Sequence, residues 1–334
     1  MIGFVEVPTS ECPGCHQTVP AAPFCGSCGA ARTAPVTARG TLLRPAVYAA
    51  APREPLWTPR ISSTCLPRLA AAMRKPFGVG LILVLVAVVI LAAAGANGPV
   101  GVVAVLGWPL LFLIYLWQTD VFRDIPIRIL VLAAALGVAL GVGWWLLAGR
   151  ILAGSYGLST GSALMLTGVL NVGLLITAGS AVLMLMPAVL TRLLAMPVRE
   201  SLDGFVVGAF GALWFMTAAS TTIVAPQFVE GLIDDRGAAR VLEDALSYGI
   251  VNPITATAAG GLVGMSLWFT PDRRPGRNPG RARTALTLCT VVGAPVYLAV
   301  WLVDATSVPP AVDLSLKLAL AVLALLVVRC AVQI

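Results

Sequence analysis

Long apolar runs alternate with short polar segments along most of the chain, from about residue 77 to the last residue. Each run has about the 20 mainly apolar residues that a helix needs to cross the hydrocarbon core of a bilayer. The runs are residues 77–96, 100–118, 127–148, 161–187, 204–224, 247–270, 284–303 and 313–332. The pattern predicts an all-α polytopic membrane helix bundle of about eight transmembrane helices, occupying residues 77–334.

Most of the basic residues that flank these runs fall on one side of the predicted membrane. They lie before the first run, after the second, fourth and sixth, and at the end of the eighth: Arg68, Arg74, Lys75, Arg123, Arg128, Arg192, Arg199, Arg273, Arg274, Arg277, Arg281, Arg283 and Arg329. The opposite side has only Arg150, Arg236 and Arg240. Because cytoplasmic loops carry the excess of Lys and Arg, we expect both termini in the cytoplasm.

Composition agrees with a membrane location. Hydrophobic residues make up 58% of the 334 residues and charged residues only 11%, with a formal net charge of +7. A soluble domain is normally about a quarter charged. The lipid bilayer is therefore the first expected partner.

The N-terminal segment, residues 1–31, contains two cysteine pairs. Cys12 and Cys15 form one C-x-x-C, and Cys25 and Cys28 form another. Two such pairs can complete a tetrahedral zinc shell, and a shell closed by four thiolates is structural rather than catalytic. The alternatives are disulfides, which belong to oxidising compartments, or free thiols. We favour zinc, with His16 as a neighbour and not a ligand.

Residues 32–76 are rich in Ala, Pro and Arg, with prolines at positions 35, 45, 52, 55, 59 and 67. No helical or strand periodicity persists there, which indicates a disordered cytosolic linker.

The largest non-cytoplasmic loop spans residues 226–248 and is acidic. Val241, Leu242, Ala245 and Leu246 have the spacing of a short surface helix. The loop could dock an extracytoplasmic partner or a cation. We favour a solvated connector.

Glycines recur four residues apart in three of the apolar runs. The pairs are Gly137 and Gly141, Gly204 and Gly208, and Gly260 and Gly264. Small residues at this spacing let helix backbones approach closely, so we expect these positions to pack helix against helix.

Four polar residues in or beside the runs are candidates for function: Asn171, Asp203, Asn252 and Lys317. Lys317 could pair with Asp313 at i,i+4 or extend to the interface, and we favour extension. No Asp, Glu or His falls mid-span. Their absence argues against a proton-coupled pump and an intramembrane metalloprotease.

The sequences "CPGC" and "FCGSCG" resemble the short N-terminal zinc ribbons of bacterial multi-pass membrane proteins. The resemblance covers roughly residues 10–31. It implies a small zinc-bound fold that stabilises or interacts, and it implies no particular activity.

The stretch from Asp203 resembles part of the PrsW-type intramembrane protease family. Asp203, Gly204 and Gly208 match the D-G-x-x-x-G helix start, and Phe215 matches the aromatic of F-x-x-x-E. The glutamate position falls on Ala219, and neither the paired glutamates nor the histidine of the family is present. The resemblance therefore implies the fold and not the activity.

Three functions follow from these features. The favoured one is a non-catalytic scaffold or regulatory subunit in the bacterial plasma (inner) membrane, whose zinc ribbon contacts a membrane or cytosolic protein. The alternative is a transporter or lipid-handling protein, and a divergent PrsW-like protease ranks below both. Nucleic acid is not an expected partner, because the segment between Cys15 and Cys25 has no Lys or Arg.

Overall fold

The computed structural model describes residues 9–12, 15–20, 74–118, 125–156, 165–194, 200–229, 238–269, 279–304 and 309–332. Linker residues 32–73 and the loops between these ranges lie outside the described residues.

Within the described residues, eight helices are long and apolar enough to cross a membrane, which confirms the predicted number of spans. The protein is a multi-pass membrane protein. Its long helical segments are α2 (Arg74–Ala93), α3 (Asn97–Gln118), α5 (Ile127–Tyr156), α6 (Met165–Leu193), α7 (Ser201–Val229), α9 (Asn252–Leu267), α10 (Pro279–Asp304) and α11 (Pro310–Val332).

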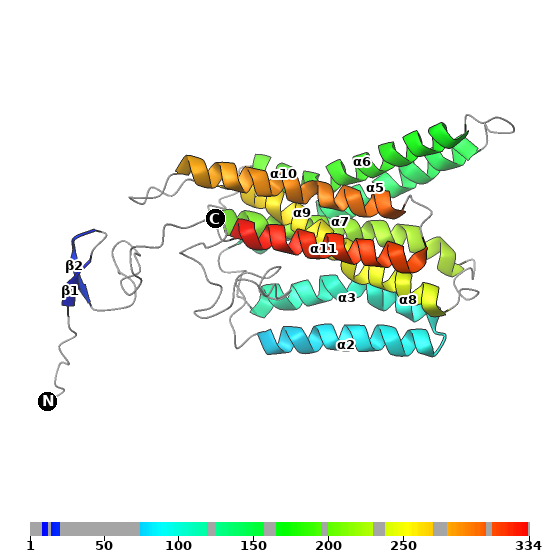
Figure 1. Cartoon of the computed structure of the whole chain (residues 1–334), viewed down its shortest axis with the longest axis horizontal. Coiled ribbons are helices and arrows are strands. Elements are labelled where there is room, and N and C mark those ends of the chain that lie inside the picture. Colours follow the sequence, from blue (N-terminus) through cyan, green and yellow to red (C-terminus); the bar gives the residue numbers. More distant parts are fainter. Residues whose placement is uncertain are drawn as a thin grey trace.

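Helices α7 and α9 form the centre of the bundle (Figure 1). The spanning segment of α7 is 89% buried and the one that contains α9 is 78% buried, against 17% to 56% for the other six. The outer helices expose Val, Leu and Ile side chains such as Ile82, Leu110 and Leu175. Lipid tails are as apolar as these side chains, so an exposed apolar surface is the expected outer face of a membrane bundle.

The sixth span is longer than its apolar run indicates. Helix α8 (Ala238–Leu246) continues without a break through a π-helical segment, η1 (Ser247–Val251), into α9. Val241 and Ala245 of α8 are buried against α2 and α3. The short helix was predicted, but its interpretation as part of a solvated connector was wrong, because its apolar face completes the core between α2 and α3.

Consecutive spans run in opposite directions, so each end of the bundle collects its own set of residues. We call the end where α2 begins and α11 finishes the basic end; the C-terminus of the protein lies there (Figure 1). The other end, which we call the far end, carries the turn between α2 and α3, where Gly95 adopts a φ of 70°.

A two-stranded hairpin is the other described element. Strand β1 (Thr9–Glu11) pairs antiparallel with β2 (Thr18–Pro20), with Ser10 opposite Val19. The strands flank the first cysteine pair.

Candidate functional site

The turn between β1 and β2 carries Cys12 and Cys15. The Cys12 N–H donates to the Gln17 carbonyl at 3.0 Å, and the His16 N–H donates to the Cys12 carbonyl at 2.9 Å. His16 closes the turn with a φ of 56°, in the left-handed region. Cys12 is buried and forms a small cluster with Val19, and the half-buried Cys15 packs against this cluster. The two thiols are therefore held on one tight turn beside a small apolar cluster.

This turn has the chemistry of half a zinc site. Two cysteines two residues apart on a tight turn are the usual half of a tetrahedral thiolate shell. Cys25 and Cys28, the other predicted ligands, lie outside the described residues. In the described part of the chain, no three His, Cys, Asp or Glu side chains form a group that could hold a metal. His16 places Nδ1 3.0 Å from Glu11 Oε1.

The glycines of α7 and α9 bring these two helices into backbone contact. A Cβ atom added at Gly204 would lie 2.5 Å from the carbonyl oxygen of Gly264, and one at Gly260 would lie 2.5 Å from that of Gly208. Real Cβ atoms do not approach an oxygen this closely. The contact is reciprocal along both antiparallel helices, so only glycine fits at these positions.

Helix α5 also approaches α7 in the same way. A Cβ atom at Gly141 would lie 2.6 Å from the Phe215 carbonyl oxygen, and one at Gly137 would overlap the carbonyl oxygen of Gly211. All six glycines singled out from the sequence thus lie where α7 meets α5 or α9.

Three of the four candidate polar residues have described side chains, and they do not form one site. Asp203 and Asn252 are both buried. The contact of Gly204 with Gly264 places Asp203 beside the end of α9, whereas Asn252 begins that helix. At a rise of 1.5 Å per residue, the two lie roughly 18 Å apart along the axis. The side chain of Asn171, in α6, lies outside the described residues.

Lys317 of α11 is paired inside the bundle. Its Nζ lies 2.6 Å from Asp313 Oδ2, and the two side chains are only 5% and 13% exposed. The prediction that Lys317 extends to the interface was wrong. A buried ammonium group is costly unless it has a counter-charge. The carboxylate one helical turn away supplies that counter-charge, so the side chain does not have to reach the interface.

Two of the positions compared with the PrsW-type family, Phe215 and Ala219, lie inside an apolar cluster. Phe215 and Ala219, which holds the place of the family's glutamate, are fully buried. They pack with Met216, Ala256 and Ala259. A methyl group at Ala219 can neither bind a metal nor move a proton, so this cluster serves packing.

Sequence reasoning missed a polar contact in the same cluster. The Tyr297 hydroxyl of α10 lies 3.3 Å from Ser180 Oγ of α6 and 3.6 Å from Met216 Sδ of α7. It links three helices. The sequence feature that could have predicted this contact is the presence of a tyrosine and a serine within apolar runs. A hydroxyl buried there is expected to find a hydrogen-bond partner.

Replacing Tyr297 with phenylalanine should lower the free energy of unfolding by about 1 kcal/mol, because the Ser180 hydroxyl loses its partner across the helices. The midpoint of unfolding in SDS measures the change. Thr177→Val is the matched control, since among the described residues the Thr177 hydroxyl donates only to the Gly173 carbonyl of its own helix. Equal midpoints for the two variants would contradict a stabilising role for Tyr297.

Comparison of the sequence with family models, with curated proteins and with solved structures found no match.

Proposed function

We propose that this multi-pass membrane protein is a non-catalytic scaffold or regulatory subunit of a membrane complex, and that its N-terminal segment binds zinc and recognises a protein partner in the cytoplasm. The observation that carries the proposal is the hairpin turn that holds Cys12 and Cys15 together. The resemblance of residues 10–31 to short zinc ribbons supports the same interpretation. Zinc in a thiolate shell would fold a segment too small to hold a core of its own.

The packing of the bundle supports a scaffold over a protein that moves a polar solute between α7 and α9. These central helices touch backbone to backbone at Gly204, Gly208, Gly260 and Gly264. A solute path between them would require the helices to separate and lose this contact. The glycine contacts instead make a rigid core, around which the outer helices present apolar surface to lipid or to membrane partners.

A transporter or lipid-handling function is the second candidate. One observation favours it, a cavity at the far end of the bundle between α3, α7 and the α8–η1 segment. This cavity lies beside the central helices and not between them.

The zinc proposal predicts a metal content. Full-length protein purified in mild detergent should hold about one zinc ion per molecule, bound by Cys12, Cys15, Cys25 and Cys28. The Cys12→Ser/Cys15→Ser double variant should lose it, while Cys289→Ser/Cys330→Ser, in the membrane helices, should keep it. Elemental analysis of the gel-filtration peak measures the ratio. Zinc retained by the first double variant would contradict the assignment.

The scaffold proposal is tested by partner recovery from native membranes in mild detergent. Wild type should recover a protein that Cys12→Ser/Cys15→Ser loses and that Cys289→Ser/Cys330→Ser still recovers. A partner retained by all three would move recognition to the membrane bundle. No reproducible partner for any of them would overturn the scaffold proposal.

A further inference from the structure

A cavity of about 190 Å³ lies at the far end of the bundle. Its walls come from the start of α3, the end of α7 and the α8–η1 segment. Most of the lining is apolar or small, and three residues in it are polar. The lining residues are Asn97, Val100, Gly101, Ala104, Val105, Val224, Val241, Asp244, Ala245 and Tyr248. An apolar pocket with few polar groups is the usual form of a small-molecule site.

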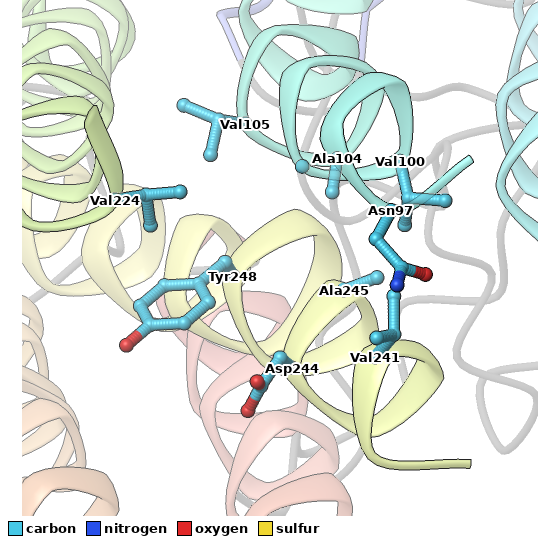
Figure 2. Close-up of a pocket in the computed structure, with 10 residues that line it drawn as sticks. Asn97, Val100, Ala104, Val105, Val224, Val241, Asp244, Ala245 and Tyr248 are labelled. Atoms are coloured by element: carbon cyan, nitrogen blue, oxygen red, sulfur yellow. The ribbon is translucent and has the colours of Figure 1, made fainter. Parts of the chain in front are cut away.

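Two of the three polar lining residues come from one wall of the cavity, and the third, Asn97, comes from the start of α3. Asp244 and Tyr248 are four residues apart and extend from the same side of the α8–η1 segment (Figure 2). Val105 and Val224 stand on the opposite side of the opening in this view. A ligand held here would therefore meet the Asp244 carboxylate and the Tyr248 hydroxyl on one side, and Val105 and Val224 on the other.

The π-helical segment helps to shape this wall. Gly249 of η1 approaches α3 so closely that an added Cβ atom would lie 3.1 Å from the Ala104 carbonyl oxygen. Single π-helical turns within α-helices are frequent at functional sites. Here the turn lies between Asp244 and the buried core of α9, where it sets the direction in which the cavity residues of α8 and η1 face.

We propose that this cavity binds a primary ammonium group attached to a short alkyl tail. A cavity of about 150 Å³ accommodates benzene, so one of this size fits a tail of about six carbons. The only charged side chain among the described lining residues is Asp244, which favours a cation. A carboxylate offers about four lone-pair sites, so Asp244 can accept a hydrogen bond from a ligand while it keeps a partner within the protein.

The test uses the full-length protein in nanodiscs of phosphatidylcholine and three probes with the same number of carbons: hexylammonium, 1-hexanol and hexanoate. Hexylammonium should raise the melting temperature saturably, hexanol should bind more weakly, and hexanoate should have no effect. Asp244→Asn should weaken hexylammonium binding about tenfold and bring it to the level of hexanol, because a hydrogen bond to a charged group is lost.

Two further variants make the test specific. Glu243→Gln removes the neighbouring carboxylate, which does not line the cavity, and should bind hexylammonium as wild type does. Val224→Phe adds bulk at a half-buried lining position and should weaken both hexylammonium and hexanol. If Asp244→Asn fails to fold, the ranking of the three probes on wild type and Val224→Phe still decides the outcome.

Three results would overturn the proposal: hexanoate binding as well as hexylammonium, a non-saturable effect of hexylammonium, or equal binding to wild type and Asp244→Asn. The source of the ammonium is a separate arm of the experiment. If phosphatidylethanolamine in the disc competes with hexylammonium, the natural ligand is a lipid headgroup. If it does not compete, the ligand is a free amine.

Discussion

Replacing Gly208 with leucine is expected to abolish the folded bundle. Gly208 faces Gly260 across the contact between α7 and α9, and a Cβ atom there would overlap the Gly260 carbonyl oxygen. Overpacking against side chains costs about 1–3 kcal/mol. The obstacle at Gly208 is backbone, which cannot change rotamer, so we expect a larger loss. Detergent-solubilised protein should be recovered in low yield, without a monodisperse gel-filtration peak.

The control for this prediction is Gly143→Leu on α5. Gly143 is exposed, and no atom lies within 4 Å of the position where a Cβ would be. The substitution should leave stability within about 0.5 kcal/mol of wild type. If Gly208→Leu eluted and melted as Gly143→Leu does, the close approach of α7 and α9 would be refuted.

Replacing Lys317 with methionine is expected to destabilise the bundle by about 3–5 kcal/mol. The substitution keeps the length of the side chain and removes its ammonium, so the carboxylate of Asp313 loses the group that lies 2.6 Å from it. A second substitution, Asp313→Asn, should restore most of the loss, because the double variant no longer buries an uncompensated charge. Unfolding in SDS across the four proteins of this cycle measures the coupling.

Arg240→Met is the matched control for Lys317. Arg240 is an exposed basic residue at the same end of the bundle. Losing an exposed charge changes stability by no more than about 0.5 kcal/mol. A Lys317→Met variant as stable as Arg240→Met would show that the ion pair makes no net contribution to folding.

The spacing of small residues identified the contact positions but not their partners. Gly204, Gly208, Gly260 and Gly264 stand out in the sequence because pairs of glycines four residues apart suit close helix packing. Nothing in that spacing says that α7 packs against α9, or that Gly137 and Gly141 of α5 contact α7 as well. Those pairings join residues far apart in the sequence.

The sequence indicated some residues of the far-end cavity but not their arrangement. Asp244 was visible as one acidic residue of a loop, and Val241 and Ala245 as one face of a short helix. The π-helical segment has no sequence signal of its own. It joins α8 to α9 and places Asp244 and Tyr248 on one cavity wall, an arrangement that the loop composition did not indicate.

The sequence by itself determined that the protein has eight spans and, apart from the extension of the sixth, about where they lie. The reason is local: a bilayer sets the length of an apolar helix, and each helix satisfies its backbone hydrogen bonds internally. Only the tertiary structure decided which spans are central, which glycines meet, and that Lys317 pairs with Asp313. All eight spans are apolar, so hydropathy does not distinguish a face that meets lipid from one that meets another helix. That distinction depends on the fit of surfaces brought together by the fold.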